Sequence, residues 1–75
     1  MTAEQMTIAQ IVGENLKSAR KAKGLTQKQV AAYLNKYQPD YSEYESGLVQ
    51  LDYEKIISLC KLLDITPNDL FSVNK

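Results

Sequence analysis

The stretch from Leu25 to Gly47, LTQKQVAAYLNKYQPDYSEYESG, constrains the fold more than any other part of this sequence. Thr26, with a glutamine three residues later, has the pattern of a helix N-cap closed by a capping box. Asn35 follows where the chain must turn, and asparagine tolerates left-handed backbone better than other residues that carry a Cβ. Pro39 suits the first position of a further helix, because its missing N–H needs no partner there. The stretch therefore predicts two short helices joined by a tight turn.

The rest of the chain also has a helical pattern, because apolar residues recur every three or four positions and no segment alternates with a period of two. Thr7 is expected to cap a first helix that ends at Gly24. Asp52 is expected to cap a fourth helix, and Thr66 a short fifth one that ends near Phe71. The side chains expected to face the core are Ile8, Val12, Leu16, Ala19, Val30, Ala31, Leu34, Tyr41, Tyr44, Leu48, Tyr53, Ile56, Ile57, Cys60 and Leu63.

Five helices with short connections predict an all-α fold in a single compact domain. Seventy-five residues are enough for one domain with a small core. We expect residues 1–75 to form that domain and the ends, 1–7 and 72–75, to be flexible. No apolar run approaches the roughly 20 residues needed to cross a bilayer, and no signal peptide precedes the domain. We therefore expect no membrane contact. We expect a cytoplasmic protein that is encoded by a bacterium or by a phage.

The composition argues against catalysis and against a metal centre. Histidine is absent and Cys60 is the one cysteine, so the commonest general base and the usual zinc ligands are missing. No nucleophile–base pair can be assembled, and Cys60 is best interpreted as a small buried hydrophobe. We expect neither an enzyme nor a cofactor. The chain is also too short for a separate ligand-sensing domain, so no small-molecule ligand is expected.

The charges are balanced overall but unevenly distributed. Residues 1–37 carry six basic and two acidic side chains, whereas residues 38–75 carry three basic and seven acidic ones. A net charge of zero argues against strong non-specific binding to nucleic acid. The asymmetry nevertheless allows one basic surface on a neutral chain. The alternative is that the lysines only solvate a helix face.

From Val12 to Phe71 the sequence resembles the phage repressor/Cro-type (lambda repressor-like, XRE-type) helix-turn-helix DNA-binding domains. No single piece of the match is specific, but the ordered string with unbroken spacing is. The string consists of Arg20, Gly24-Leu25-Thr26-Gln27, Ala31, Leu34, Gln38-Pro39, Glu45-x-Gly47 and Leu62-Leu63-x-Ile65-Thr66-Pro67-x-x-Leu70-Phe71. The resemblance implies the compact five-helix fold of that family, with the helix-turn-helix in helices two and three.

The resemblance also implies roles for individual residues. Arg20 and Glu45 match an ion pair that ties the first helix to the end of the third. A glutamine at the head of the third helix can pair with adenine N6 and N7, and a carboxylate can accept from cytosine N4. The implied base-contacting residues are Gln38, Pro39, Asp40, Ser42 and Glu43. The implied phosphate-contacting residues are Gln27, Lys17, Lys21, Lys28, Lys36 and Ser46.

Several residues depart from the family's usual pattern. Asp40 and Glu43 face outwards on the third helix with no basic residue beside them, and acids near phosphates weaken binding. Leu48 and Val49 replace a basic or polar pair, so fewer counterions would be released from DNA. These departures keep a second interpretation open, a protein-binding module on the same fold, such as an antitoxin or an anti-repressor-like partner.

Tyrosines surround the motif at helical spacing, at Tyr33, Tyr37, Tyr41 and Tyr44. Aromatic platforms of this kind can stack single-stranded nucleic acid, but packing is the simpler explanation. Tyr41 stands where the family normally has a β-branched residue. It can be buried only if its hydroxyl group reaches a partner or the surface.

The leading hypothesis is a sequence-specific regulator that binds double-stranded DNA, most simply a dimeric repressor of a phage, a plasmid or a similar mobile element. The fourth helix is apolar on more than one face, since Leu59 and Leu62 add to its stripe, and Phe71 and Val73 follow nearby. We expect a homodimer through helices four and five and the C-terminal tail, and a palindromic operator to match. The alternative is that these side chains only complete the core.

Overall fold

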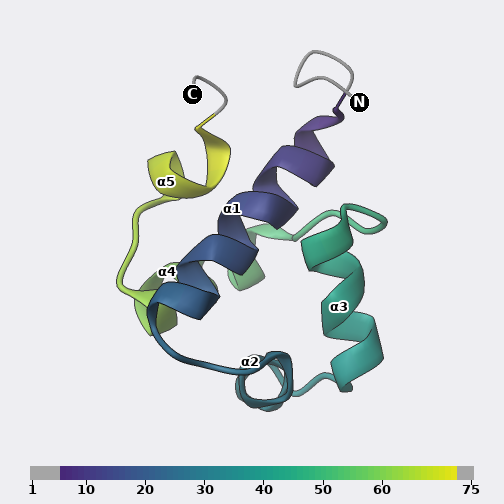
Figure 1. Cartoon of the computed structure of the whole chain (residues 1–75), viewed down its shortest axis with the longest axis vertical. Helices are drawn as coiled ribbons and strands as arrows, with labels where there is room; N and C mark the ends of the chain where they lie inside the picture. The colour runs from purple at the N-terminus through teal and green to yellow at the C-terminus, as the bar shows by residue number, and fades with distance from the viewer. Residues whose placement is uncertain (1–5, 73–75) are drawn as a thin grey trace.

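A computed structural model describes residues 6–72, which form five α-helices and no strand (Figure 1). The helices are α1 (Ile8–Ala22), α2 (Gln27–Tyr33), α3 (Gln38–Ser46), α4 (Tyr53–Leu63) and α5 (Pro67–Phe71). This confirms the predicted all-α, five-helix architecture. None of these helices is long and apolar enough to cross a bilayer.

Local sequence signals set the helix boundaries. Thr7, Thr26 and Thr66 each cap a helix through a complete capping box. Asn35 has the predicted positive φ of 57° in the turn between α2 and α3. Pro39 lies one position later than predicted, because α3 already begins at Gln38. Proline is accommodated there because the first four N–H groups of a helix have no partner within it.

The predicted flexible ends fall partly outside the described residues, which exclude 1–5 and 73–75. Within the described part, Thr7 caps α1, and the carbonyl oxygen of Ser72 accepts a hydrogen bond of 3.1 Å from Asn15 Nδ2. Asn15 Nδ2 also donates to the carbonyl oxygen of Leu70, at 2.8 Å. The Asn15 contacts tie the end of α5 to α1, and the flexibility of the two ends stays a prediction.

The core lies where α1 packs against both α3 and α5, with α2 against α3 and α4 against α5. In Figure 1, α3 and α5 lie on opposite sides of α1. The buried apolar side chains are Val12, Leu16, Val30, Ala31, Tyr41, Tyr44, Leu59, Cys60, Leu63 and Leu70.

Four of the predicted core side chains are exposed instead: Ile8 (57%), Leu48 (76%), Tyr53 (86%) and Ile57 (54%). On α4 the inward face is centred on Leu59, Cys60 and Leu63. Ile57 lies about 100° around the helix axis from the half-buried Ile56, so it turns outwards. Leu59 is fully buried, so it completes the core and does not contribute to an exposed patch.

Gly13, a buried residue of α1, allows the close approach of α1 and α3. A Cβ atom at this position would collide with the carbonyl oxygens of Tyr44 and Glu45 at the end of α3. The apolar pattern of the sequence did not predict this contact. The available signal was an isolated glycine inside a helical pattern, which weakens the helix and therefore points to a packing reason.

Candidate nucleic-acid interface

The outer edge of α3 is exposed to solvent. Gln38, Pro39, Asp40, Glu43 and Ser46 are exposed, and Ser42 is half-buried. The opposite side of the helix is buried through Tyr41, Tyr44 and Glu45, and α3 packs against α1 and α2. The helix therefore presents a continuous polar edge to solvent while its inner face is held by the domain.

A buried ion pair fixes α3 to α1. Arg20 Nε lies 2.6 Å from Glu45 Oε2, and Arg20 Nη2 donates to Glu45 Oε1 at 3.2 Å. The remaining terminal nitrogen of Arg20 donates to the carbonyl oxygen of Leu25 at 2.8 Å. The two-pronged pairing restrains the angle as well as the distance between the two helices. It is the pair that the family resemblance implies.

Tyr41 adds a third donor to the same carboxylate. Its hydroxyl group donates to Glu45 Oε2 at 2.5 Å, and its side chain is fully buried. The hydroxyl group of Tyr41 therefore has the partner that a buried tyrosine needs. The ring also makes an edge-to-face contact with Tyr44, with centroids 6.3 Å apart.

These contacts hold Glu45 ionised. Burial by itself raises the pKa of Glu45, but hydrogen bonds from Arg20, Tyr41 and Gln27 outweigh burial and set the pKa below its ordinary value. Burial, followed by the hydrogen bond to Glu45, raises the pKa of Tyr41, so the phenol stays neutral. The hydrogen bond to Glu45 raises the pKa of Arg20. The cluster therefore contains one anion and one cation near neutral pH.

We expect this cluster to make stability depend on pH in the acid range. Glu45 has a lower pKa in the folded chain than its ordinary 4.5, so the unfolded state binds more protons as the pH falls. Glu45 contributes its full stabilisation at pH values above its ordinary pKa. This stabilisation is lost as the pH falls through the lowered pKa of the folded chain. Urea unfolding at a series of pH values should show this loss, and the Glu45→Gln variant should show a flatter profile. If Glu45→Gln lost as much stability at low pH as the unsubstituted chain, the pH dependence would come from other carboxylates.

Two glutamines extend the cluster to the surface. Gln27 Nε2, at the start of α2, donates to Glu45 Oε1 at 3.0 Å. Gln38 Nε2, at the start of α3, donates to Gln27 Oε1 at 2.6 Å. Gln27 is half-buried and Gln38 is exposed. The structure thus brings the implied phosphate contact Gln27 beside the implied base contact Gln38, and joins both to Glu45. Neither the residue spacing nor the family resemblance predicted this link.

The implied phosphate-contacting lysines are more dispersed. Lys17 lines a hollow between α1 and the end of α3 together with Ser46, whose hydroxyl group donates to the carbonyl oxygen of Glu43. Lys21 and Lys28 are exposed on α1 and α2. The Lys36 ammonium group lies 5.8 Å from the centroid of the Tyr44 ring, a cation–π contact. Among residues 6–72 the ion pairs are Arg20–Glu45 and Lys55–Asp52, so within that range no carboxylate holds any of these four lysines.

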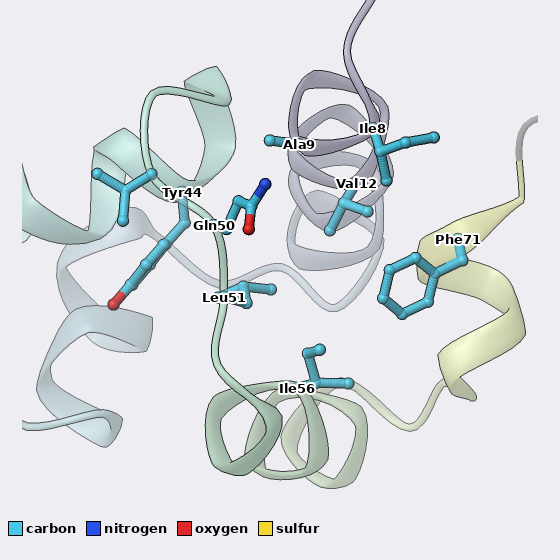
Figure 2. A pocket seen from close by; sticks show the side chains of 9 residues that line it. Ile8, Ala9, Val12, Tyr44, Gln50, Leu51, Ile56 and Phe71 are labelled. Atoms are coloured by element: carbon cyan, nitrogen blue, oxygen red, sulfur yellow. The ribbon is translucent and has the colours of Figure 1, made fainter.

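A second surface feature is an apolar hollow of about 150 Å³ beside α5. Figure 2 shows four side chains pointing toward one another around it: Val12 of α1, Ile56 of α4, Phe71 of α5, and Leu51 of the loop before α4. Ile8 and Val49, both more than 40% exposed, complete its rim. Tyr44, from the buried side of α3, and Gln50, in the loop that follows α3, also line the hollow.

Comparison with known proteins gives consistent matches. A family model described as "Helix-turn-helix" matches residues 16–70. A protein of Bacillus subtilis (strain 168), named an uncharacterized HTH-type transcriptional regulator, YqaE, is 42% identical over 53 residues. That match covers 71% of this chain but 46% of the relative, so the chain spans about half of the relative's length.

Two solved structures have the same arrangement of helices. The clp gene regulator ClgR from C. glutamicum superposes with a TM-score of 0.82 at 25% identity, over 92% of this chain and 90% of that chain. The restriction-modification controller protein C.AhdI from Aeromonas hydrophila superposes with a TM-score of 0.75 at 30% identity, over 84% of this chain and 96% of that chain.

Proposed function

Because the chain belongs to the helix-turn-helix family, whose members are DNA-binding transcriptional regulators and not enzymes, we propose that it is a sequence-specific repressor acting in the bacterial cytoplasm. In this proposal α3 enters the major groove of double-stranded DNA. Repression is steric, since a chain bound at an operator that overlaps a promoter excludes polymerase. The observation that carries the proposal is the free polar edge of α3, held at a fixed angle by Arg20 and Glu45.

The proposed contacts divide into base and phosphate contacts. Gln38, Asp40, Ser42 and Glu43 contact base edges, and Pro39 packs at the head of the same helix. Gln27, Ser46 and the lysines Lys17, Lys21, Lys28 and Lys36 contact phosphates. Lys17 and Ser46 line one hollow at the end of α3, which they share with the carboxylates of Glu14 and Glu45.

We further propose a homodimer that binds a palindromic operator with half-sites about one helical turn apart. Ile57 of α4 and Phe71 of α5 are 54% and 44% exposed, and the apolar hollow of Figure 2 lies beside Phe71. A contact through α4 and α5 would leave α3 free, since α3 and α5 lie on opposite sides of α1 (Figure 1). Val73, also expected in this contact, lies outside the described residues.

A protein-binding module is the second candidate, and one observation favours it. Asp40 and Glu43 are both exposed on α3, and the apolar Leu48 and Val49 are exposed just beyond its end. This combination suits a basic protein partner better than it suits phosphates. An antitoxin or an anti-repressor-like protein would use the surface in that way.

A selection of random double-stranded oligonucleotides with the purified chain separates the two candidates. A DNA-binding regulator should enrich one sequence family. On the enriched duplex, Gln38→Ala or Glu43→Ala should each cost about 1–3 kcal/mol of binding free energy and relax one base position. Lys61→Ala, on the exposed side of α4, is the control and should leave base preference unchanged. Enrichment of no sequence would favour the protein-binding candidate.

A further inference from the structure

The apolar hollow beside α5 is lined by four helices and one loop, and its inner wall lies inside the domain. Val12 of α1 and Tyr44 of α3 are buried, and Leu51 and Ile56 are half-buried. The volume of about 150 Å³ is close to that of a dry apolar cavity that takes up benzene. The hollow therefore has room for a molecule of one or two small rings.

Hydrogen bonds hold the walls of the apolar hollow in place. Asn15 Nδ2 donates to the backbone carbonyl groups on either side of Phe71, at 2.8 and 3.1 Å. On the side of the loop that follows α3, the backbone N–H of Val49 donates to the carbonyl oxygen of Glu43 at 3.3 Å. Walls that are already fixed lose little conformational freedom when a ligand enters, so little affinity is lost in ordering the site.

The lining determines which chemistry an occupant needs. Within residues 6–72 no charged side chain lines the apolar hollow, and a buried charge without a partner would be costly there. In Figure 2 the hydroxyl group of Tyr44 points away from Phe71, whereas the amide group of Gln50 lies at the edge of the hollow. An amide can donate or accept a hydrogen bond. The matching occupant is therefore neutral and apolar, with one hydrogen-bonding group.

A small molecule suits the apolar hollow better than a second protein chain does. A preformed, mostly apolar hollow with a single polar group at its edge has the usual composition of a small-molecule site. A stable contact between two proteins buries about 1,200–2,000 Å² of surface. A hollow that holds one or two rings provides far less than that.

We propose that the apolar hollow binds a small neutral aromatic molecule of one or two rings, with indole as the model, which packs against Phe71 and bonds to the amide group of Gln50. This site differs from the sequence-based expectation of no small-molecule ligand, which considered only a separate sensing domain. A bound molecule would contact α3 from its buried side, through Tyr44. The inference does not rest on the proposed function, because binding is measured without DNA.

Titration of the full, isotope-labelled chain with indole tests the inference by nuclear magnetic resonance. Saturable shift changes should fall on Ile8, Val49, Ile56 and Phe71, with a dissociation constant of about 1 mM or below. The signals of α2, which does not line the hollow, should stay in place. Benzoate, an anion of similar size, should bind at least about tenfold more weakly, because its charge would lose water in an apolar site.

Three variants test the location of the site. Ala9 lines the hollow, so Ala9→Leu should fill it and weaken indole binding by at least about tenfold, since a packed space admits no ligand. Ala22→Leu makes the same change at the exposed end of the same helix and should leave the affinity unchanged. Gln50→Ala should weaken the binding of indole by roughly two- to tenfold, but not that of toluene, which offers the amide no hydrogen bond.

Two results would overturn the inference. One is a set of indole-induced shifts that do not saturate, or an equal affinity for indole in Ala9→Leu and Ala22→Leu. The other is a dimer, detected by analytical ultracentrifugation, that dissociates in Ala9→Leu while the unsubstituted chain binds no indole. A second copy of the chain, and not a small molecule, would then fill the hollow.

Discussion

Replacing Glu45 with alanine is expected to lower the free energy of unfolding by about 3–5 kcal/mol. The substitution leaves the Arg20 guanidinium group buried without its anion and removes the acceptor of the Tyr41 hydroxyl group. A domain of this size is stable by roughly 4–11 kcal/mol, so the substitution should remove a large fraction of the total stability. Urea denaturation followed by circular dichroism measures the change, provided that the dependence of the unfolding free energy on urea concentration has the same slope in both chains.

The same helix supplies the control for this prediction. Glu43→Ala removes an exposed carboxylate and should change stability by no more than about 0.5 kcal/mol. Replacing both members of the buried pair, with Met at positions 20 and 45, should recover part of the loss, because no unpaired charge then remains inside. A loss below about 1 kcal/mol in Glu45→Ala would mean that the pair does not hold α3 to α1.

Gly13→Val should destabilise the chain by about 3 kcal/mol, at the upper end of the usual effect of overpacking. The new Cβ would meet the carbonyl oxygens of Tyr44 and Glu45, and backbone atoms cannot move aside as a flexible side chain can. The expected response is a separation of α1 from α3, which would also shift the reading edge of α3. Thermal and urea unfolding should both register the change.

The matched control introduces the same residue at an exposed position of α1. Ser18→Val carries the same weak helix propensity of valine but meets no backbone, so it should cost no more than about 0.5 kcal/mol. Similar losses at positions 13 and 18 would show that valine in the helix, and not the helix contact, causes the effect.

Local signals made much of the fold predictable. Each of the capping boxes at Thr7, Thr26 and Thr66 lies within four consecutive residues, so the sequence alone contains both partners. The positive φ of Asn35 was likewise predictable from residue type and position. The resemblance to a known family added the Arg20–Glu45 pair, which no local pattern indicates because 25 residues separate the partners.

The errors lie where tertiary packing decides. Ile57 and Tyr53 fit a helical apolar stripe, but the direction of the core relative to α4 turns them outwards. Leu48 fits the apolar spacing of the buried tyrosines, but it follows Gly47, where the chain leaves the helix, and it is exposed. The hydrogen bonds that join Gln27 to Glu45 and Gln38 run between separate helices, so residue spacing cannot predict them.

Mapping the DNA contact on an isotope-labelled chain tests the central claim most directly. On titration with the enriched duplex, the largest chemical-shift changes should fall on the exposed edge of α3 and at the start of α2, with Gln38 and Glu43 among them. Changes confined to the α4–α5 face, or a duplex that leaves the signals of α3 unmoved, would contradict the account.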